Sequence, residues 1–368
     1  MGLSILRQEP RFDFVSWRRA AYVASLLAAL SGVAGFFLHG GLRYGVDFAG
    51  GVAVQVAFAK PVGDESIKAV LAESALPGLA VQQFGDGAQD YLIRFSTPDI
   101  QAENIRSTVL DALVKAFPDN AVTVQRLEVV GPKVGADLRN AALGAMCYAI
   151  LLITVYISGR FEHRWFIAAF MAAVLSGGVY AVSLFGVSMI WRVAIALCLT
   201  LIICWKLNLN FALGAMISLL HDVILTVGLL ALMGKEFDLN VIAALLTVVG
   251  YSLNDTIIVF DRIRENLHRQ KEKSLQPMSR IVNDSCNQTL SRTILTSGTT
   301  AVAALSLFVL GGGVIHDFAL TMLMGVVIGT YSSIFVASPV LLAFGDTSSY
   351  LVPVRKAEYE RPGEHGMV

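Results

Sequence analysis

Charged side chains are scarce in this chain. Asp, Glu, Lys and Arg make up 15% of the 368 residues, whereas apolar residues make up 55%. The 28 basic residues balance the 28 acidic ones, so the net charge of zero gives no reason to expect nucleic acid as a partner. The mean hydropathy of +0.64 exceeds what the core of a soluble domain requires. These values exclude an ordinary soluble protein and indicate an integral membrane protein.

Cysteine is also rare, and its spacing excludes two further classes of protein. The four cysteines lie in apolar segments or in a basic stretch and form no CxxC pair: Cys147, Cys198, Cys204 and Cys286. A disulfide framework or a cysteine-based zinc site would need paired thiols at characteristic spacings. We therefore expect no metal and no bound cofactor.

Long apolar runs, in contrast, are plentiful. A membrane-spanning helix needs roughly 20 apolar residues. Runs near that length predict about eight spans, at residues 21–38, 141–157, 166–187, 189–205, 211–233, 239–260, 293–310 and 318–344. The predicted fold class is therefore a polytopic α-helical membrane protein.

Basic residues gather before the first span and after the sixth, which places both regions on the cytoplasmic side by the positive-inside rule. They are Arg7, Arg11, Arg18 and Arg19, and then Arg262, Arg264, Arg269, Lys271, Lys273 and Arg280. Eight spans return the C-terminus to the same side, so both termini are predicted to be cytoplasmic. The first span lacks a small-residue cleavage site after it, which favours a retained signal anchor over a signal peptide.

The predicted organisation has five parts, with two features inside the fourth. They are a cytoplasmic segment (1–20), the first span (21–38), an outer domain (39–140), a transmembrane bundle (141–344, with an additional helical hairpin at 166–205 and a basic cytoplasmic loop at 261–292) and a cytoplasmic tail (345–368).

The outer domain reads as a βαββαβ unit. Strand-like alternation in "VAVQVAF", "LAVQQF", "DYLIRFS" and "AVTVQRLEVV" is interrupted by helical spacing in "ESIKAVLAESAL" and "AENIRSTVLDALVKAF". This order predicts a ferredoxin-like split sandwich. The unit has no cysteine or histidine and no carboxylates grouped for catalysis, so a docking role is favoured over a catalytic one.

Two glycine-containing stretches flank this domain, "YGVDFAGG" and "VVGPKVGADL". A phosphate-binding loop would need a helix directly after the glycines, whereas a strand follows the first stretch. Gly50, Gly51 and Gly131 would permit backbone angles closed to other residues, and Pro132 would stiffen one side. We expect these stretches to act as hinges between the domain and the membrane.

Several polar residues lie inside the spans, where ionisable groups are costly and therefore suggest a function. Helical spacing puts Thr247, Tyr251, Asn254, Asp255 and Arg262 on one stripe of the sixth helix, and this stripe is expected to face other helices. Thr289, Arg292, Thr296, Thr299 and Thr300 share a face of the seventh. The predicted depths of Asp255 and Arg292 are similar, so the two could pair.

Two interpretations of this pair are open. Movement of Arg292 relative to Asp255 would let the carboxylate gain and lose a proton, as a proton-driven machine requires. Alternatively, the two form a static ion pair, or Asp255 reaches the inner surface. The hydroxyl-lined faces favour the proton relay. His221 and Asp222, in the fifth span, are adjacent and point about 100° apart, so we expect that they cannot both face one site. Asp261 to Glu265 are expected to form a solvated helix end.

Six motifs in order resemble the SecF branch of the SecD/SecF protein-export family: "YGVDFAGG", "VGPKVGADL", "LLHDV", "VVGYSLNDTIIVFDRIREN", "LSRTILTSGTT" and "GTYSSIFVASP". The resemblance implies a non-enzymatic subunit, of the resistance-nodulation-division superfamily, in a bacterial inner membrane. With SecD it would use the proton-motive force to promote preprotein translocation through SecYEG, with YajC, YidC and membrane lipid as further candidate partners. Asp255 and Arg292 match the family's proton-sensitive aspartate and its neighbouring arginine.

The chain departs from the six-helix pattern of this family by an extra hairpin at about residues 166–205. It is either a tandem duplication of the following hairpin or an unrelated insertion. Two other functions are also compatible with a membrane protein of this kind. One is a stand-alone proton-coupled exporter of lipids or small molecules, although such proteins usually carry two six-helix units. The other is an assembly factor without transport activity.

Overall fold

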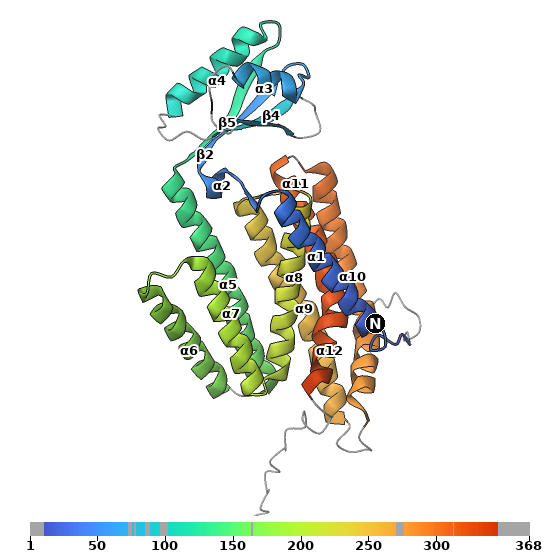
Figure 1. The fold of residues 1–368 in the computed structure, drawn as a ribbon. Helices are drawn as coiled ribbons and strands as arrows, with labels where there is room; N and C mark the ends of the chain where they lie inside the picture. The colour runs from blue at the N-terminus through green and yellow to red at the C-terminus, as the bar shows by residue number, and fades with distance from the viewer. Residues whose placement is uncertain are drawn as a thin grey trace, which may run out of the picture.

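The computed structural model of the chain has two parts, a bundle of long helices and a small α/β domain at one end of it (Figure 1). It describes residues 11–72, 76, 79–84, 89–95, 102–162, 165–269, 276–311 and 313–344. Arg7, Lys271 and Lys273, which entered the topology prediction, lie outside these ranges, as does the predicted cytoplasmic tail at 345–368. Within them, eight helices are long and apolar enough to cross a membrane, which supports a multi-pass membrane protein.

These eight helices are α1 (Arg18–Leu38), α5 (Pro132–Glu162), α6 (Trp165–Leu184), α7 (Met189–Lys206), α8 (Asn210–Leu232), α9 (Leu239–Arg269), α10 (Met278–Leu310) and α11 (Gly313–Ser332). At the end of the bundle next to the α/β domain, six of these helices begin or end within three residues of the predicted spans, whereas α5 begins nine residues and α11 five residues earlier than predicted.

The predicted basic loop at 261–292 is wrong, because most of it is helical. Helix α9 continues to Arg269 and α10 begins at Met278. Buried Ile263 and Leu267 of α9 belong to the same apolar cluster as Met278 and Ile281 of α10, so the two helices stay packed beyond the apolar span. On the outside of this extension, i,i+3 and i,i+4 ion pairs join Arg262 to Glu265 and Arg269 to Glu265.

The last span changes its winding where α11 ends. A π-helix (Ser333–Ala337) is followed by the short helix α12 (Ser338–Val340) and a 3₁₀ turn (Leu341–Phe344). Pro339 has no N–H to continue the α-helical ladder, and Ser338 Oγ instead donates to Ser333 O at 2.8 Å.

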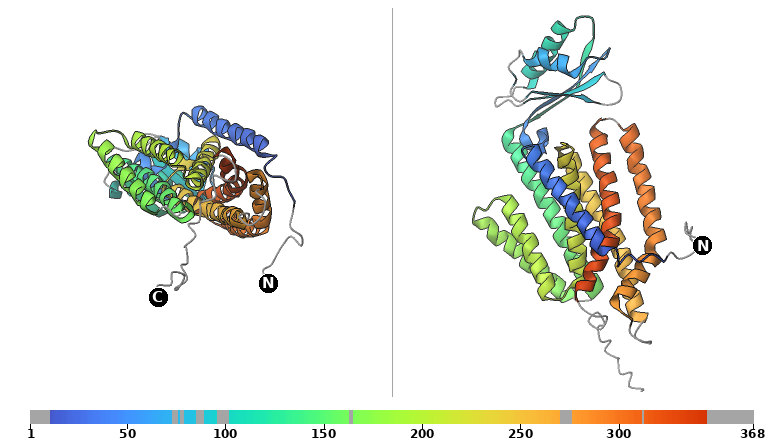
Figure 2. Two further views of the ribbon diagram at one scale, coloured as in Figure 1. Left: turned by 90° about the horizontal axis from the view of Figure 1, so that it is seen from below. Right: turned by 45° about the vertical axis from the view of Figure 1, so that its right-hand side comes forward.

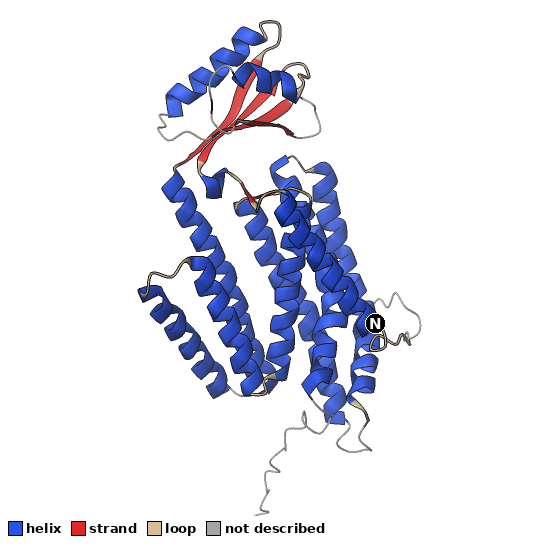
Figure 3. Ribbon diagram, viewed as in Figure 1, coloured by secondary structure: helices blue, strands red, loops and turns tan. Residues whose placement is uncertain are grey.

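The α/β domain has the predicted βαββαβ order. Its elements are β2 (Gly51–Phe58), α3 (Asp64–Ala72), β3 (Ala80–Phe84), β4 (Asp90–Phe95), α4 (Ala102–Ala116) and β5 (Val122–Val130). The strands form one antiparallel sheet in the order β3-β4-β2-β5, as a ferredoxin-like domain requires. Both helices cover the sheet face that points away from the bundle (Figure 3), and that face contains the domain's apolar core.

The junction between the two parts is docked on the bundle rather than being a free linker. The two-residue strand β1 (Arg43–Tyr44) pairs in parallel with β6 (Glu236–Phe237), which lies between α8 and α9. The short helix α2 (Val46–Ala49) follows and packs against α5. Gly135 of α5 leaves room for this contact, because an added Cβ would lie 2.9 Å from Gly50 N.

The glycine prediction for this junction is only partly right. Gly50 and Gly51 do adopt left-handed backbone angles, with φ of 75° and 130°. Gly131 is not among the residues with positive φ, and Pro132 is the first residue of α5, where its missing N–H costs nothing. The outer domain therefore ends at Val130 rather than at residue 140, and the connection to α5 is one residue long.

The extra hairpin consists of α6 and α7. It lies at one edge of the bundle, where it packs against α5, and α7 also reaches α8 (Figure 2). Its position leaves α1, α9, α10 and α11 together on the other side.

Candidate functional site

Asp255 is buried at the meeting point of three helices. Its carboxylate, on α9, accepts hydrogen bonds from Ser297 Oγ at 3.2 Å and Thr296 Oγ1 at 3.4 Å, both on α10. Ser297 in turn accepts from Tyr251 of α9 at 3.2 Å and lies 2.6 Å from Thr330 Oγ1 of α11. The carboxylate thus sits at the end of a connected set of hydroxyl groups.

The predicted Asp255–Arg292 ion pair is absent from this conformation. Within the described residues, no Lys, Arg or His nitrogen lies within 4.0 Å of the Asp255 carboxylate. Arg292 begins the turn of α10 that ends at Thr296, and its side chain is exposed. Asp255 therefore has hydroxyl donors but no fixed cation.

The predicted polar stripe of α9 is divided between two faces. Asp255 is buried and Tyr251 is half-buried, whereas Asn254 and Thr247 are exposed. Thr299 of α10 is also exposed and donates only within its own helix. The expectation that the whole stripe faces other helices of this chain is wrong for Thr247 and Asn254.

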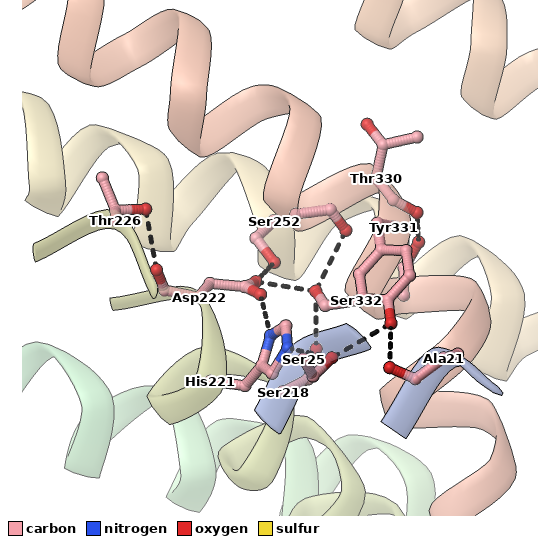
Figure 4. Close-up of polar contacts among 12 residues, drawn as sticks. Ala21, Ser25, Ser218, His221, Asp222, Thr226, Ser252, Thr330, Tyr331 and Ser332 are labelled. Atoms are coloured by element: carbon pink, nitrogen blue, oxygen red, sulfur yellow. Dashed lines mark hydrogen bonds and ion pairs between the residues drawn. The ribbon is translucent and has the colours of Figure 1, made fainter. Parts of the chain in front are cut away.

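Asp222 forms a second buried site, which Figure 4 shows. Its Oδ2 accepts from Ser252 of α9 and, at 2.8 Å, from Ser332 of α11. Ser218 donates to Ser332 at 3.0 Å. Helices α9 and α11 thus supply donors to a fully buried carboxylate of α8, and Ser218 of α8 bonds to one of those donors.

His221 joins the same site, which corrects the prediction that the adjacent residues cannot face one site. Its Nδ1 lies 3.0 Å from Asp222 Oδ1, and its Nε2 lies 2.9 Å from Ser25 Oγ on α1. The two Cα–Cβ bonds do diverge, but the imidazole is long enough for its ring to turn back to the neighbouring carboxylate.

Close helix packing makes these contacts possible. A Cβ added at Gly329 of α11 would lie 2.9 Å from Ser252 Cβ, so the glycine lets α11 and α9 approach at the level of Asp222. Gly325, one turn earlier, similarly accommodates Val248. The sequence contains the Gly325-xxx-Gly329 spacing that permits this packing, whereas Ser25, Ser252 and Ser297 were not predicted as site residues. A lone serine in an apolar helix carries no signal of which helix it will face.

Ser297 is expected to matter for stability, because it links three helices through Asp255, Tyr251 and Thr330. Ser297→Ala would leave a buried carboxylate with one donor fewer, at a cost of about 1–3 kcal/mol. Thermal unfolding of the purified chain measures this loss. Ser306→Ala is the matched control, since Ser306 Oγ donates only to Val302 O of the same helix. Equal unfolding temperatures for the two variants would contradict the role given to Ser297.

A polar cleft of about 560 Å³ lies between the open face of the sheet and the outer end of the bundle. Gln55, Gln82 and Gln83 line it from the sheet, and Asp238 and Asp317 line it from the bundle. Burial raises the pKa of Asp238, and the nearby carboxylates of Asp47 and Asp317 add to that effect. Burial also lowers the pKa of Arg94, whose guanidinium pairs with Glu236 across the cleft.

The Arg94–Glu236 ion pair is expected to hold the outer domain in one orientation. Both side chains are partly exposed, at 24% and 33%, so the pair contributes up to about 1 kcal/mol. Arg94→Ala should therefore broaden the distances between spin labels at Val114 and Leu310, which are exposed on α4 and α10. The charge swap Arg94→Glu with Glu236→Arg should narrow them again. If Arg94→Ala leaves the distribution unchanged, the pair does not orient the domain.

Comparison with known proteins agrees with the motifs. Residues 109–191 and 182–347 match the family described as protein export membrane protein SecD/SecF, C-terminal, and residues 35–62 match the SecD/SecF GG motif. The protein translocase subunit SecF of Magnetococcus marinus is 41% identical over 97% of this chain and 99% of its own length. SecF of Vibrio alginolyticus is 35% identical over 95% of each chain.

The fold also resembles solved structures. The crystal structure of SecDF from Thermus thermophilus, described as a translocon-associated membrane protein, superimposes with a TM-score of 0.66 and 31% identity. A SecDF structure in a super-membrane-facing form gives a TM-score of 0.54 and 32% identity. These matches cover 93% and 92% of this chain but only 39% of each SecDF chain.

Proposed function

The chain belongs to the SecF branch of the SecD/SecF family of protein-export membrane proteins, and on that premise we propose that it uses the proton-motive force, together with SecD, to promote preprotein translocation through SecYEG. In this proposal the chain is a transport subunit, not an enzyme, and protons are its coupling ion. Its membrane is a bacterial inner membrane, with both termini in the cytoplasm.

One observation carries the proposal: the Asp255 carboxylate is fully buried, and among the described residues only hydroxyl groups bond to it. A fixed arginine partner would hold the carboxylate ionised, whereas hydroxyl groups can donate to the ionised form and accept from the protonated form. Asp255 can therefore exist in either state at its position. Arg292 would complete the cycle by moving toward the carboxylate when the proton leaves.

The exposed polar groups of α9 and α10 support SecD as the covering partner. Thr247 and Asn254 of α9, with Arg292 and Thr299 of α10, would otherwise meet lipid within or near the apolar layer. A second helical subunit on this face would cover them, and the solved SecDF chains extend well beyond the 39% that this chain covers. We extend the partnership to YajC, YidC and membrane lipid as further candidates.

The outer cleft is our candidate contact for the emerging preprotein. Its open sheet face presents the side-chain amides of Gln55, Gln82 and Gln83, which can bond an unfolded backbone without regard to sequence. The one-residue connection to α5 and the docked junction would transmit movements of the bundle to this surface.

Translocation into inverted inner-membrane vesicles tests the proposal. Vesicles containing this chain and its SecD should import a signal-bearing precursor faster when energised, and an uncoupler should remove the difference. Vesicles lacking the chain should show no such difference. An uncoupler-insensitive effect would favour an assembly factor, and activity without SecD would favour a stand-alone exporter; either result would overturn the proposal.

A further inference from the structure

We propose that His221 and Asp222 form a second proton-binding site, separate from Asp255, and that its proton holds the first membrane helix against the bundle. The existence of this site is independent of the proposed export function. Release of this proton would let the first membrane helix move. Only the idea that this movement is passed on to the outer domain rests on the proposed export function.

A chain of four polar contacts leads from the carboxylate to the backbone of α1 (Figure 4). Asp222 Oδ1 lies 3.0 Å from His221 Nδ1, and His221 Nε2 lies 2.9 Å from Ser25 Oγ. Ser25 Oγ lies 3.0 Å from Tyr331 Oη, and Tyr331 Oη donates to Ala21 O at 2.6 Å. Each contact has hydrogen-bond length, so each needs one proton between its two atoms.

The available protons do not suffice if the pair carries a net charge of −1. A neutral imidazole brings one N–H, and Ser25 and Tyr331 bring one O–H each, so an ionised Asp222 leaves three protons for four contacts. One additional proton on the pair completes the chain. It forms either an imidazolium beside a carboxylate or a neutral imidazole beside a carboxylic acid, and both are the same proton-loaded state.

The hydrogen bonds to the other carboxylate oxygen of Asp222, Oδ2, indicate where the extra proton lies. Asp222 Oδ2 already accepts from Ser252 and Ser332, which are typical donors to an ionised carboxylate. The additional proton therefore lies between Oδ1 and Nδ1. When it departs to water, one contact of the chain is left with two lone pairs facing each other.

No other titratable group contacts the pair among the described residues except Tyr331. α1 contributes Ser25, α9 contributes Ser252, and α11 contributes Ser332 and Tyr331, whose ring stacks 6.0 Å from the imidazole. α5 and α7 also pack on α8 but provide no titratable partner in these contacts. The other carboxylate on these helices within the membrane, Asp255, is bonded to α10.

Loss of the proton would act at a specific part of α1. Toward the outer side, α1 and α8 meet through Gly32 and Gly228, where an added Cβ on Gly32 would lie 2.5 Å from Gly228 Cα. Toward the other end, α1 itself is bonded to the bundle through Ser25 and Ala21. The segment just before α1 is tied to α10 by the N–H groups of Phe12 and Phe14. Deprotonation would release the turns of α1 between that tie and the glycine contact, and this part of α1 would move away from α8. The junction and outer domain follow α1 directly in the chain.

Spin-label distances in the full chain with SecD, in lipid nanodiscs, test this proposal without any membrane potential. The labels go on Val23 of α1 and Leu152 of α5, both exposed, after the exposed Cys198 is replaced by alanine. Between about pH 5 and about pH 9 we expect a second, longer distance to grow several-fold in population. His221→Gln should abolish that pH response. Ser31→Ala should retain it, because Ser31 bonds only within α1.

Nitrogen-15 NMR of the unaltered protein provides the second measurement, which needs no variant at the site. We expect the His221 ring to be doubly protonated, or to be the Nε2–H tautomer beside a protonated acid, at the lower pH. A neutral Nδ1–H tautomer beside an ionised Asp222 across the whole range would overturn the proposal, as would a pH response that survives His221→Gln. Export driven through Asp255 would be unaffected by that failure.

Discussion

Asp255→Asn is expected to remove the entire part of preprotein translocation that depends on the proton-motive force. Asparagine is nearly isosteric with aspartate and can still accept a hydrogen bond from Ser297 through its side-chain oxygen. It cannot bind and release a proton near neutral pH. The remaining rate should equal that of vesicles without the chain, and energised import of a precursor into vesicles measures it.

We expect a complete loss of proton-driven translocation because no other proton-carrying group is bonded to the Asp255 carboxylate among the described residues. Within the described residues, its carboxylate oxygens have only the Thr296 and Ser297 hydroxyls as partners, and neither hydroxyl can replace a carboxylate as a proton carrier. The neutral amide also mimics the protonated state, so Asp255→Asn should hold the bundle in that one state. Arg292→Ala should also abolish the proton-driven part of translocation, but for the opposite reason. In that variant Asp255 can still lose its proton, but no guanidinium would approach the ionised carboxylate.

The control is Asp261→Asn on the same helix. Asp261 accepts from Arg160 Nη2 at 2.8 Å at the end of the bundle opposite the α/β domain, and both side chains are more than a third exposed. Its loss should therefore cost little, about 1 kcal/mol or less, and leave energised import intact. Normal import by Asp255→Asn, at equal protein levels, would exclude Asp255 as the proton carrier.

The elements whose apolar residues follow a regular pattern, either alternation along a strand or a long apolar run, were predictable from the sequence. The outer strands alternate because Val52, Val54 and Val56 face the α/β core, and their neighbours face the cleft. The spans follow from apolar length alone. The extension of α9 was not predictable in the same way, because its charged residues resemble a loop until Ile263 and Leu267 are seen to pack against α10.

The polar sites were predicted less completely, for two physical reasons. Helical spacing gives the direction of a Cα–Cβ bond but not the reach of the side chain, so the His221–Asp222 contact was excluded when it in fact forms. Spacing also says nothing about whether a polar face is covered by this chain or by another subunit. Asn254 and Asp255 are neighbours in the sequence, yet one is exposed and the other is fully buried.

The second large effect is expected at the crossing of α1 and α8. Gly32→Ala would place a methyl group 2.5 Å from Gly228 Cα, a backbone atom that cannot rotate aside. The helices must separate, which we expect to cost about 1–3 kcal/mol even though alanine is the better helix former. Thermal unfolding of the purified chain measures the cost.

Gly177→Ala in α6 is the matched control for that substitution. Nothing lies within 4 Å of the position where its Cβ would be placed, so the same exchange should stabilise the chain by about 0.5–1 kcal/mol through helix propensity alone. The difference between the two variants isolates the packing at Gly32. Separation of α1 from α8 should also lengthen the Ser25–His221 contact, so Gly32→Ala should shift the labels on Val23 and Leu152 apart even at low pH. Equal stability of the two variants, with an unchanged distance, would mean that α1 is not held at this crossing.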